Sequence, residues 1–153
     1  MENIEDIIER YGDTITRICI MNLRNSDDAK DCFQEVFIKL YQYNKPFKDD
    51  EHLKAWLIRV CINTCRDYQR KFYKPFINID DVILADKEEQ FQLLPILFTL
   101  SPKYKNILYL YYYEGYKINE ISSLLHINQN TIKSRLKRGR KLLKDKLGGE
   151  DFE

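Results

Sequence analysis

The chain has 153 residues, of which 44% are hydrophobic and 32% charged, with five Gly, four Pro and a formal net charge of +1. This composition excludes a largely disordered chain and predicts one ordinary domain or two small lobes. No apolar run approaches the roughly 20 residues of a membrane span, so no membrane insertion is expected.

The N-terminal segment "MENIEDIIER" is acidic and amphipathic. It has no basic stretch followed by an apolar run, so it does not resemble a secretion signal and we expect a cytoplasmic protein. The few helix breakers and the many Leu, Ile, Lys and Glu residues favour helices, and alternating strand-like segments are nearly absent. The predicted fold class is all-α, with two small helical domains joined by a linker.

Residues 27–43 form the first strong helical pattern. Apolar side chains fall on one side of a 3.6-residue helix at Ala29, Phe33, Val36, Phe37 and Leu40. The opposite side presents Asp31, Gln34, Glu35 and Ile38. This helix therefore buries one side and exposes the other.

Residues 52–71 form a second amphipathic helix, and Pro46 with the polar "KDDEH" marks the loop before it. Its apolar side consists of Leu53, Trp56, Leu57, Val60 and Thr64. A polar stripe beside Trp56 consists of Arg59, Asn63, Arg66 and Arg70.

The four cysteines are Cys19, Cys32, Cys61 and Cys65. They include no C-x-x-C pair, and the two histidines are far from any metal-ligand spacing, so reduced structural thiols and no metal or cofactor are expected. Cys61 and Cys65 lie one helical turn apart, which leaves a thiol switch open.

An acidic segment at residues 78–90, preceded by Pro75, predicts a linker. We expect a first domain at residues 1–74, a linker at 75–91 and a second domain at 92–153. The spacing from Asp86 to Glu89 suits a helix start, and Pro95 would kink that helix or delay it.

The second domain begins with a helix that Ser101 caps and Pro102 opens, and Gly115 is placed to end it. A short helix at residues 118–125 and a tight turn at His126 follow, and Asn128 can cap the final helix. A short helix, a tight turn and a basic helix predict a helix-turn-helix. The tyrosines at positions 109 and 111–113 are expected to fill this domain's core rather than to stack on bases.

The final helix has two unlike sides. Apolar or small residues gather on one side at Ile132, Leu136, Gly139 and Leu143. Polar and basic residues gather on the other, at Asn130, Lys133, Ser134, Lys137, Arg138, Lys141 and Lys144. A solubilising surface is one interpretation, but the tight turn before the helix favours insertion into a DNA major groove.

Two blocks of the chain resemble regions 2 and 4 of bacterial sigma factors of the extracytoplasmic-function (ECF) group. They are "DAKDCFQEVFIKLY" with "FKDDEHLKAWLIRVCINTCRDYQRK", and "LSPKYKNILYLYYYEGYKINEISSLLHINQNTIKSRLKRGRKLL". The resemblance implies a dissociable subunit that directs RNA polymerase core to promoters and helps to melt them. It also implies that Asp31, Gln34 and Glu35 dock on the clamp helices of the largest polymerase subunit, unless they are only a solvated helix face.

The resemblance further implies two DNA-binding surfaces. The promoter element near minus ten would meet Phe47, Lys48, Trp56, Arg59, Asn63 and Arg66. The element near minus thirty-five would meet Thr131, Lys133, Ser134, Lys137, Arg138, Arg140 and Lys141, with Arg140 and Lys141 at phosphates. Whether Trp56 stacks on a base or belongs to the core stays open, and an anti-sigma factor is a possible partner.

The sequence departs from the family pattern at the turn, where "LHIN" replaces the usual L-G-I and requires a left-handed backbone at His126. The alternative function is a free-standing helix-turn-helix regulator. The first domain argues against it, and the absence of a heptad seam predicts a monomer when free. An enzyme is not expected, because the chain lacks a Gly-rich phosphate loop and a nucleophile paired with a base.

Overall fold

The computed structural model describes residues 2–23, 25–71 and 94–148. Every regular element in these residues is a helix, which confirms the all-α prediction. The chain divides into two compact units, residues 1–87 and 88–153. The predicted linker and the helix start at Asp86 lie outside the described residues, and the predicted domain bounds stay a prediction.

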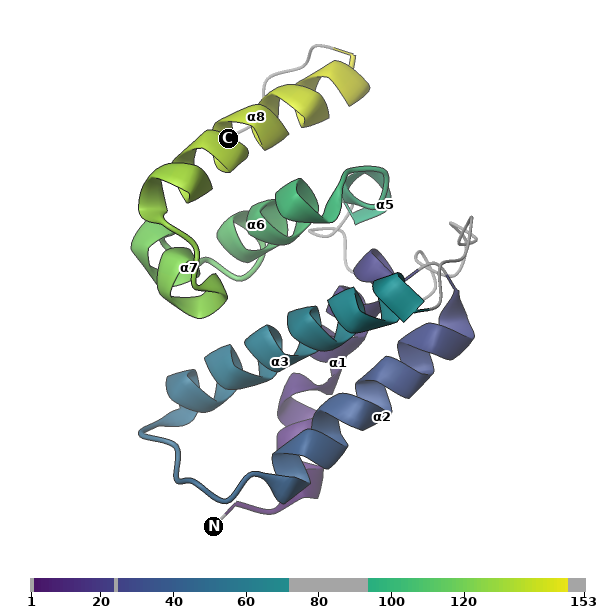
Figure 1. Cartoon of the computed structure of the whole chain (residues 1–153), viewed down its shortest axis with the longest axis vertical. Helices are drawn as coiled ribbons and strands as arrows, with labels where there is room; N and C mark the ends of the chain where they lie inside the picture. Colours follow the sequence, from purple (N-terminus) through teal and green to yellow (C-terminus); the bar gives the residue numbers. More distant parts are fainter. Residues whose placement is uncertain (1, 24, 72–93, 149–153) are drawn as a thin grey trace. The chain divides into compact units, whose positions relative to one another are not determined.

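The N-terminal unit is a bundle of three helices that pack pairwise against one another: α1 (Ile4–Asn22), α2 (Ser26–Gln42) and α3 (Asp50–Lys71) (Figure 1). Asparagine side chains cap the first two: Asn3 accepts from the Glu5 N–H at 2.9 Å and Asn25 from the Asp28 N–H at 2.8 Å. The core is built from the inward sides of all three helices. Ile15, Val36 and Leu57 are completely buried in it.

The C-terminal unit contains α5 (Leu94–Leu97), α6 (Pro102–Tyr112), α7 (Ile118–Leu125) and α8 (Gln129–Lys146) (Figure 1). The predicted start at Ser101 and Pro102 and the predicted short helix at 118–125 are confirmed. Gly115 has a positive φ of 75° just after α6, as its predicted place at the helix end requires. The prediction that tyrosines fill the core of this domain is confirmed for Tyr109. Its side chain is completely buried, and its hydroxyl donates a hydrogen bond to the Glu114 carboxylate at 2.7 Å.

Among the described residues, no helix has both the length and the apolar character needed to cross a membrane.

Candidate nucleic-acid and partner interfaces

The outer side of α2 is exposed as predicted, with Asp31 and Gln34 open to solvent. Glu35 is half-buried and forms a salt bridge with Lys39 at 3.1 Å. Ile38 lies on the same side and is 54% exposed, and with Tyr41 it is one of two exposed large hydrophobic residues among the described residues. An apolar residue within a polar helix face is an arrangement typical of protein-binding surfaces.

The loop between α2 and α3 is ordered by a cluster of aromatic rings. The Phe47 ring lies 5.2 Å from Tyr43, 5.3 Å from His52 and 5.7 Å from Trp56, measured between centroids. Asp49 fixes the start of α3 by accepting a hydrogen bond from the His52 N–H at 2.8 Å. These contacts hold the exposed Lys48 side chain at the edge of the N-terminal unit.

The structure changes the role expected of Trp56. The side chain is only 7% exposed, and its ring packs 4.8 Å from Tyr43. A base cannot stack on a ring whose faces are covered by other side chains. Of the two interpretations that the sequence left open, the core position describes this structure, and Trp56 supports the loop from beneath.

Beside this loop is a hollow of about 800 Å³ between the N-terminus of α1 and the C-terminal end of α2. Its wall includes Tyr41, Asn44, Lys45 and Phe47. Tyr41 is 80% exposed, and sequence reasoning missed it. The signal that could have found it is its place three residues after Ile38, on the same side of α2.

Glu2, Asp49 and Asp50 also line the hollow, and two of them form ion pairs. Arg10 pairs with Glu2 at 2.5 Å and with Asp50 at 2.8 Å. Tyr11 donates its hydroxyl to Asp50. Burial, reinforced by this hydrogen bond, raises the pKa of Tyr11 to about 12, so the phenol stays neutral.

The polar stripe predicted on α3 is present at its outer side. Asn63 and Arg66 are exposed, and Arg66 donates a hydrogen bond to the Asn63 amide oxygen at 2.6 Å. Arg59 is half-buried on the same helix. The Arg66 contact fixes which way the Asn63 amide faces, which is a requirement for reading one base edge.

The helix-turn-helix has the predicted backbone. His126 adopts the left-handed conformation with φ 57° and ψ 45°, and it caps the C-terminus of α7. Asn128 caps α8 by accepting from the Asn130 N–H at 2.7 Å. The predicted core side of α8 is confirmed, since Ile132, Leu136 and Leu143 are buried.

Gly139 lies on the buried side of α8, directly against α6. A Cβ added there would lie 2.9 Å from Leu108 Cδ1 and 3.2 Å from Leu108 Cγ. The absence of a Cβ at Gly139 therefore allows α6 and α8 to approach closely.

The outer side of α8 is cationic and open. Five of the predicted DNA-binding residues are exposed: Lys133, Ser134, Lys137, Arg138 and Lys141. Thr131 is half-buried in the first turn. Such a helix, with its first turns projecting from a helix-turn-helix, has the shape and charge that a major groove accepts.

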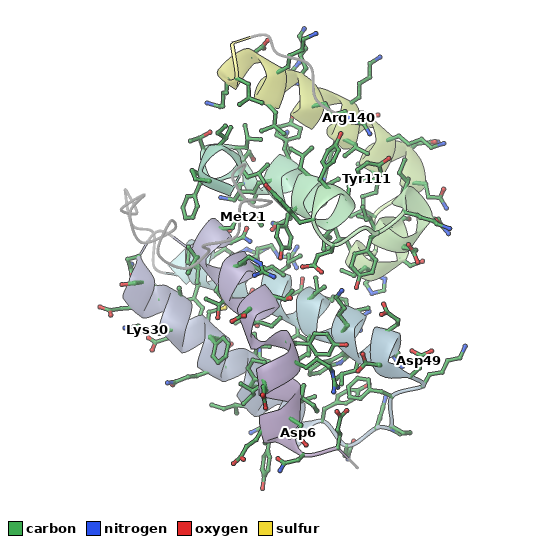
Figure 2. The ribbon with its side chains drawn as sticks, turned by 180° about the vertical axis from the view of Figure 1, so that it is seen from behind. Asp6, Met21, Lys30, Asp49, Tyr111 and Arg140 are labelled. Atoms are coloured by element: carbon green, nitrogen blue, oxygen red, sulfur yellow. The ribbon has the colours of Figure 1, made fainter. Side chains whose placement is uncertain are left out.

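Arg140 has a different surrounding from the one expected at a phosphate contact. Its Nε donates a hydrogen bond to the Tyr112 hydroxyl at 2.7 Å, and its guanidinium carbon lies 5.4 Å from the Tyr111 ring centroid. Figure 2 shows Arg140 of α8 beside Tyr111 of α6. Because these contacts tie α8 to α6, Arg140 helps to hold α8 in place, and its phosphate contact stays a prediction.

The four cysteines are free and buried, as predicted for structural thiols, and they come together although they are distant in sequence. Cys19 of α1, Cys32 of α2, and Cys61 and Cys65 of α3 are all buried, and their four sulfurs lie within 4.8 Å of one another. Hydrogen bonds from the neighbouring thiols lower the pKa of Cys32, whereas burial raises the pKa of Cys61. Sequence spacing could not reveal this group because its members come from three helices.

Comparison with known families matches both units. The model of sigma-70 region 2 matches residues 7–72, and that of sigma-70 region 4 matches residues 91–143. The chain is 31% identical over 142 residues to RNA polymerase sigma factor SigV of Bacillus subtilis, covering 89% of this chain and 86% of SigV. It is 29% identical over 164 residues to ECF RNA polymerase sigma factor SigW of the same organism, covering 93% of this chain and 87% of SigW.

Solved structures share the fold at lower identity. Sigma factor RpoE of Bartonella quintana, in complex with the anti-sigma factor NepR, superposes with a TM-score of 0.70 at 18% identity, over 96% of this chain and 98% of that one. CnrH, in complex with the cytosolic domain of CnrY, superposes with a TM-score of 0.68 at 19% identity, over 97% and 89%.

Proposed function

The chain belongs to the ECF group of RNA polymerase sigma factors, and we propose that it directs core RNA polymerase to specific promoters and assists their melting. The observation that carries this function is the presence, in one chain, of a region 2 bundle and a region 4 helix-turn-helix with a cationic outer face. A free-standing regulator has no use for region 2, so the sigma factor role is favoured over that alternative. The reaction itself belongs to the polymerase.

The outer side of α2 is proposed as the surface that docks on the polymerase clamp helices. Asp31, Gln34 and Glu35 supply polar and charged groups, and Ile38 supplies apolar area that becomes buried on docking. Because Ile38 is 54% exposed, burying the rest of its side chain stabilises a complex by roughly half of the about 1.5 to 3 kcal/mol of complete burial. This surface adjoins the hollow, because Tyr41 of the hollow wall lies on the same side of α2 as Ile38.

The minus-ten element is proposed to meet Phe47, Lys48, Arg59, Asn63 and Arg66, with Trp56 supporting the loop from its core position. The hollow beside the loop would receive an unstacked base of the non-template strand, and the exposed Tyr41 ring would provide the stacking surface. Lys45 and Lys48 would attract the backbone of the displaced strand.

The minus-thirty-five element is proposed to meet the first turns of α8. Lys133, Ser134, Lys137 and Arg138 would face base edges, while Thr131 and Lys141 would contact phosphates. Arg140 would act indirectly, since its tyrosine contacts hold the helix at a fixed angle to α6.

The protein is proposed to act in the cytoplasm, as a monomer when free. Both structural neighbours were solved with a bound partner, and NepR is an anti-sigma factor. A similar partner is therefore proposed for this chain, which would mask these surfaces until it is released.

The test is transcription by sigma-free core polymerase with the purified full chain. It should produce transcripts from defined start sites at promoters of its own genome, and absence of start-site selection at all of them refutes the function. Replacing Gln34 and Glu35 together with Ala should weaken capture of core polymerase without loss of helical content. The matched control is Asp13→Ala, an exposed carboxylate on α1 of the same unit, which should leave capture unchanged.

A further inference from the structure

The N-terminal unit contains a group of four cysteines that the proposed function does not use. They are all the cysteines of the chain, and each is at most 1% exposed. Their Sγ atoms lie within 4.8 Å of one another, with Cys19–Cys61 and Cys32–Cys65 separations of 3.5 Å. We call this group the cysteine cluster.

The sulfur positions match a single tetrahedral ion. A Zn–S bond of about 2.3 Å places the four sulfurs of a tetrahedral site about 3.8 Å apart. The separations of 3.5 Å in two pairs, and at most 4.8 Å in all, bracket that value. The sulfurs need to change their separations by about 1 Å or less to complete the site.

From this arrangement we propose that the cysteine cluster binds one Zn²⁺ ion through four thiolates and thereby joins α1, α2 and α3. Each thiol that is protonated releases its proton to solvent on binding, so the Zn²⁺ with four thiolates carries two net negative charges. The proposal goes beyond promoter recognition and does not depend on it.

Two other chemical states of the cysteine cluster, disulfide bonds and an iron–sulfur cluster, fit the geometry less well. A disulfide requires an S–S distance of about 2.05 Å. Both close pairs are 3.5 Å apart and join different helices, so each would have to close by about 1.5 Å, compared with about 1 Å or less for zinc. An iron–sulfur cluster distributes its four cysteines over two or four irons, so cysteines on different irons have sulfurs further apart than those of a single-ion site.

The surroundings favour an ion with negatively charged ligands. Lys39 of α2 donates a hydrogen bond to the Thr64 hydroxyl at 3.0 Å, which places its ammonium beside the residue next to Cys65. Lys39 also pairs with Glu35 at 3.1 Å, so this cation compensates only a small part of the negative charge of the four thiolates. An ion held by three helices also stabilises a bundle whose own core is small.

Metal content of the full chain is the direct measurement. Protein purified without oxygen, dialysed against Zn²⁺ and then against metal-free buffer, should retain one zinc per chain by mass spectrometry. Replacement by Co²⁺ should give the visible absorption of tetrahedral Co²⁺ with thiolate ligands. The variants Cys19→Ala and Cys65→Ala should lose the ion, whereas Val36→Ala, a completely buried residue of α2 that is not a ligand, should keep it.

A second measurement covers the case in which the cysteine variants fail to fold. In the wild-type full chain, a strong chelator should lower the melting temperature of the N-terminal unit by more than about 5 °C, and added Zn²⁺ should restore that temperature. Three results would overturn the proposal: a folded wild-type chain with four reactive thiols and no zinc, a mass showing disulfides as the native state, or iron with visible absorption as purified. None of these readouts uses transcription, so the proposal can fail while the sigma factor function stands.

Discussion

Replacing Gly139 with Ala sets two opposing effects against each other at the contact between α6 and α8. Ala is favoured over Gly in a helix by about 1 kcal/mol, so helix propensity alone predicts a more stable C-terminal unit. The added Cβ, however, would lie 2.9 Å from Leu108 Cδ1 and 3.2 Å from Leu108 Cγ. Leu108 is completely buried, so it cannot move aside without disturbing its neighbours.

Overpacking of this kind costs about 1 to 3 kcal/mol, which exceeds the propensity gain. We therefore expect Gly139→Ala to destabilise the C-terminal unit by about 1 kcal/mol, or about 4 to 8 °C in melting temperature for a domain of this size. The assay is amide hydrogen exchange of peptides from α6 and α8, which reports this unit separately from the N-terminal one.

The matched control is Gly12→Ala in α1. Its added Cβ would lie 3.6 Å from Ile8 Cγ2 and 3.8 Å from Phe33, which are ordinary contact distances. That variant should therefore stabilise the N-terminal unit by about 1 kcal/mol.

A double variant isolates the contact. In a Leu108→Ala background the space is vacant, so adding Gly139→Ala should there stabilise the unit by about 1 kcal/mol. A stabilising effect of Gly139→Ala in the wild-type background as well would refute the close contact between the two helices.

Three further predictions concern DNA. Lys137→Ala and Arg138→Ala should relax the base preference at the upstream element by about 1 to 3 kcal/mol per lost base contact. Lys141→Ala should instead weaken binding to all DNA sequences alike and reduce the slope of log affinity against log salt concentration by about one. Selection from randomised upstream DNA that returns one motif for all three variants would contradict this. Asn63→Ala should impair promoter opening more than duplex binding. Because the amide is proposed to read a base, a pre-melted template should restore little activity to this variant. Full restoration would show that Asn63 only assists melting. Tyr41→Ala should destabilise the open complex by about 1 to 3 kcal/mol, measured by permanganate reactivity of unpaired thymines. Tyr41→Phe keeps the ring and should behave as wild type. An equal loss of open complex in both variants would exclude stacking.

Local features of this protein could be predicted from the sequence because they depend on neighbours within one or two helical turns. The short helix at residues 118–125 and the Asn128 cap follow from the identity of a few adjacent residues, whereas the left-handed His126 followed from the turn pattern of the family that the sequence resembles. The exposed sides of α2 and α8 likewise follow from helical periodicity, which separates polar from apolar residues without reference to any partner.

The tertiary structure alone decided what each of these sides touches. Trp56 became part of an aromatic cluster because Tyr43 and Phe47 pack over it, and Arg140 became a positioning residue because α6 presents tyrosines to it. The cysteines lie together only because the three helices pack with an axial offset and a rotation that bring all four side chains to one place in the core. Periodicity determines which direction a side chain faces along its own helix, but the distance between two side chains on different helices depends on the axial offset and crossing angle of the pair, which no local pattern encodes.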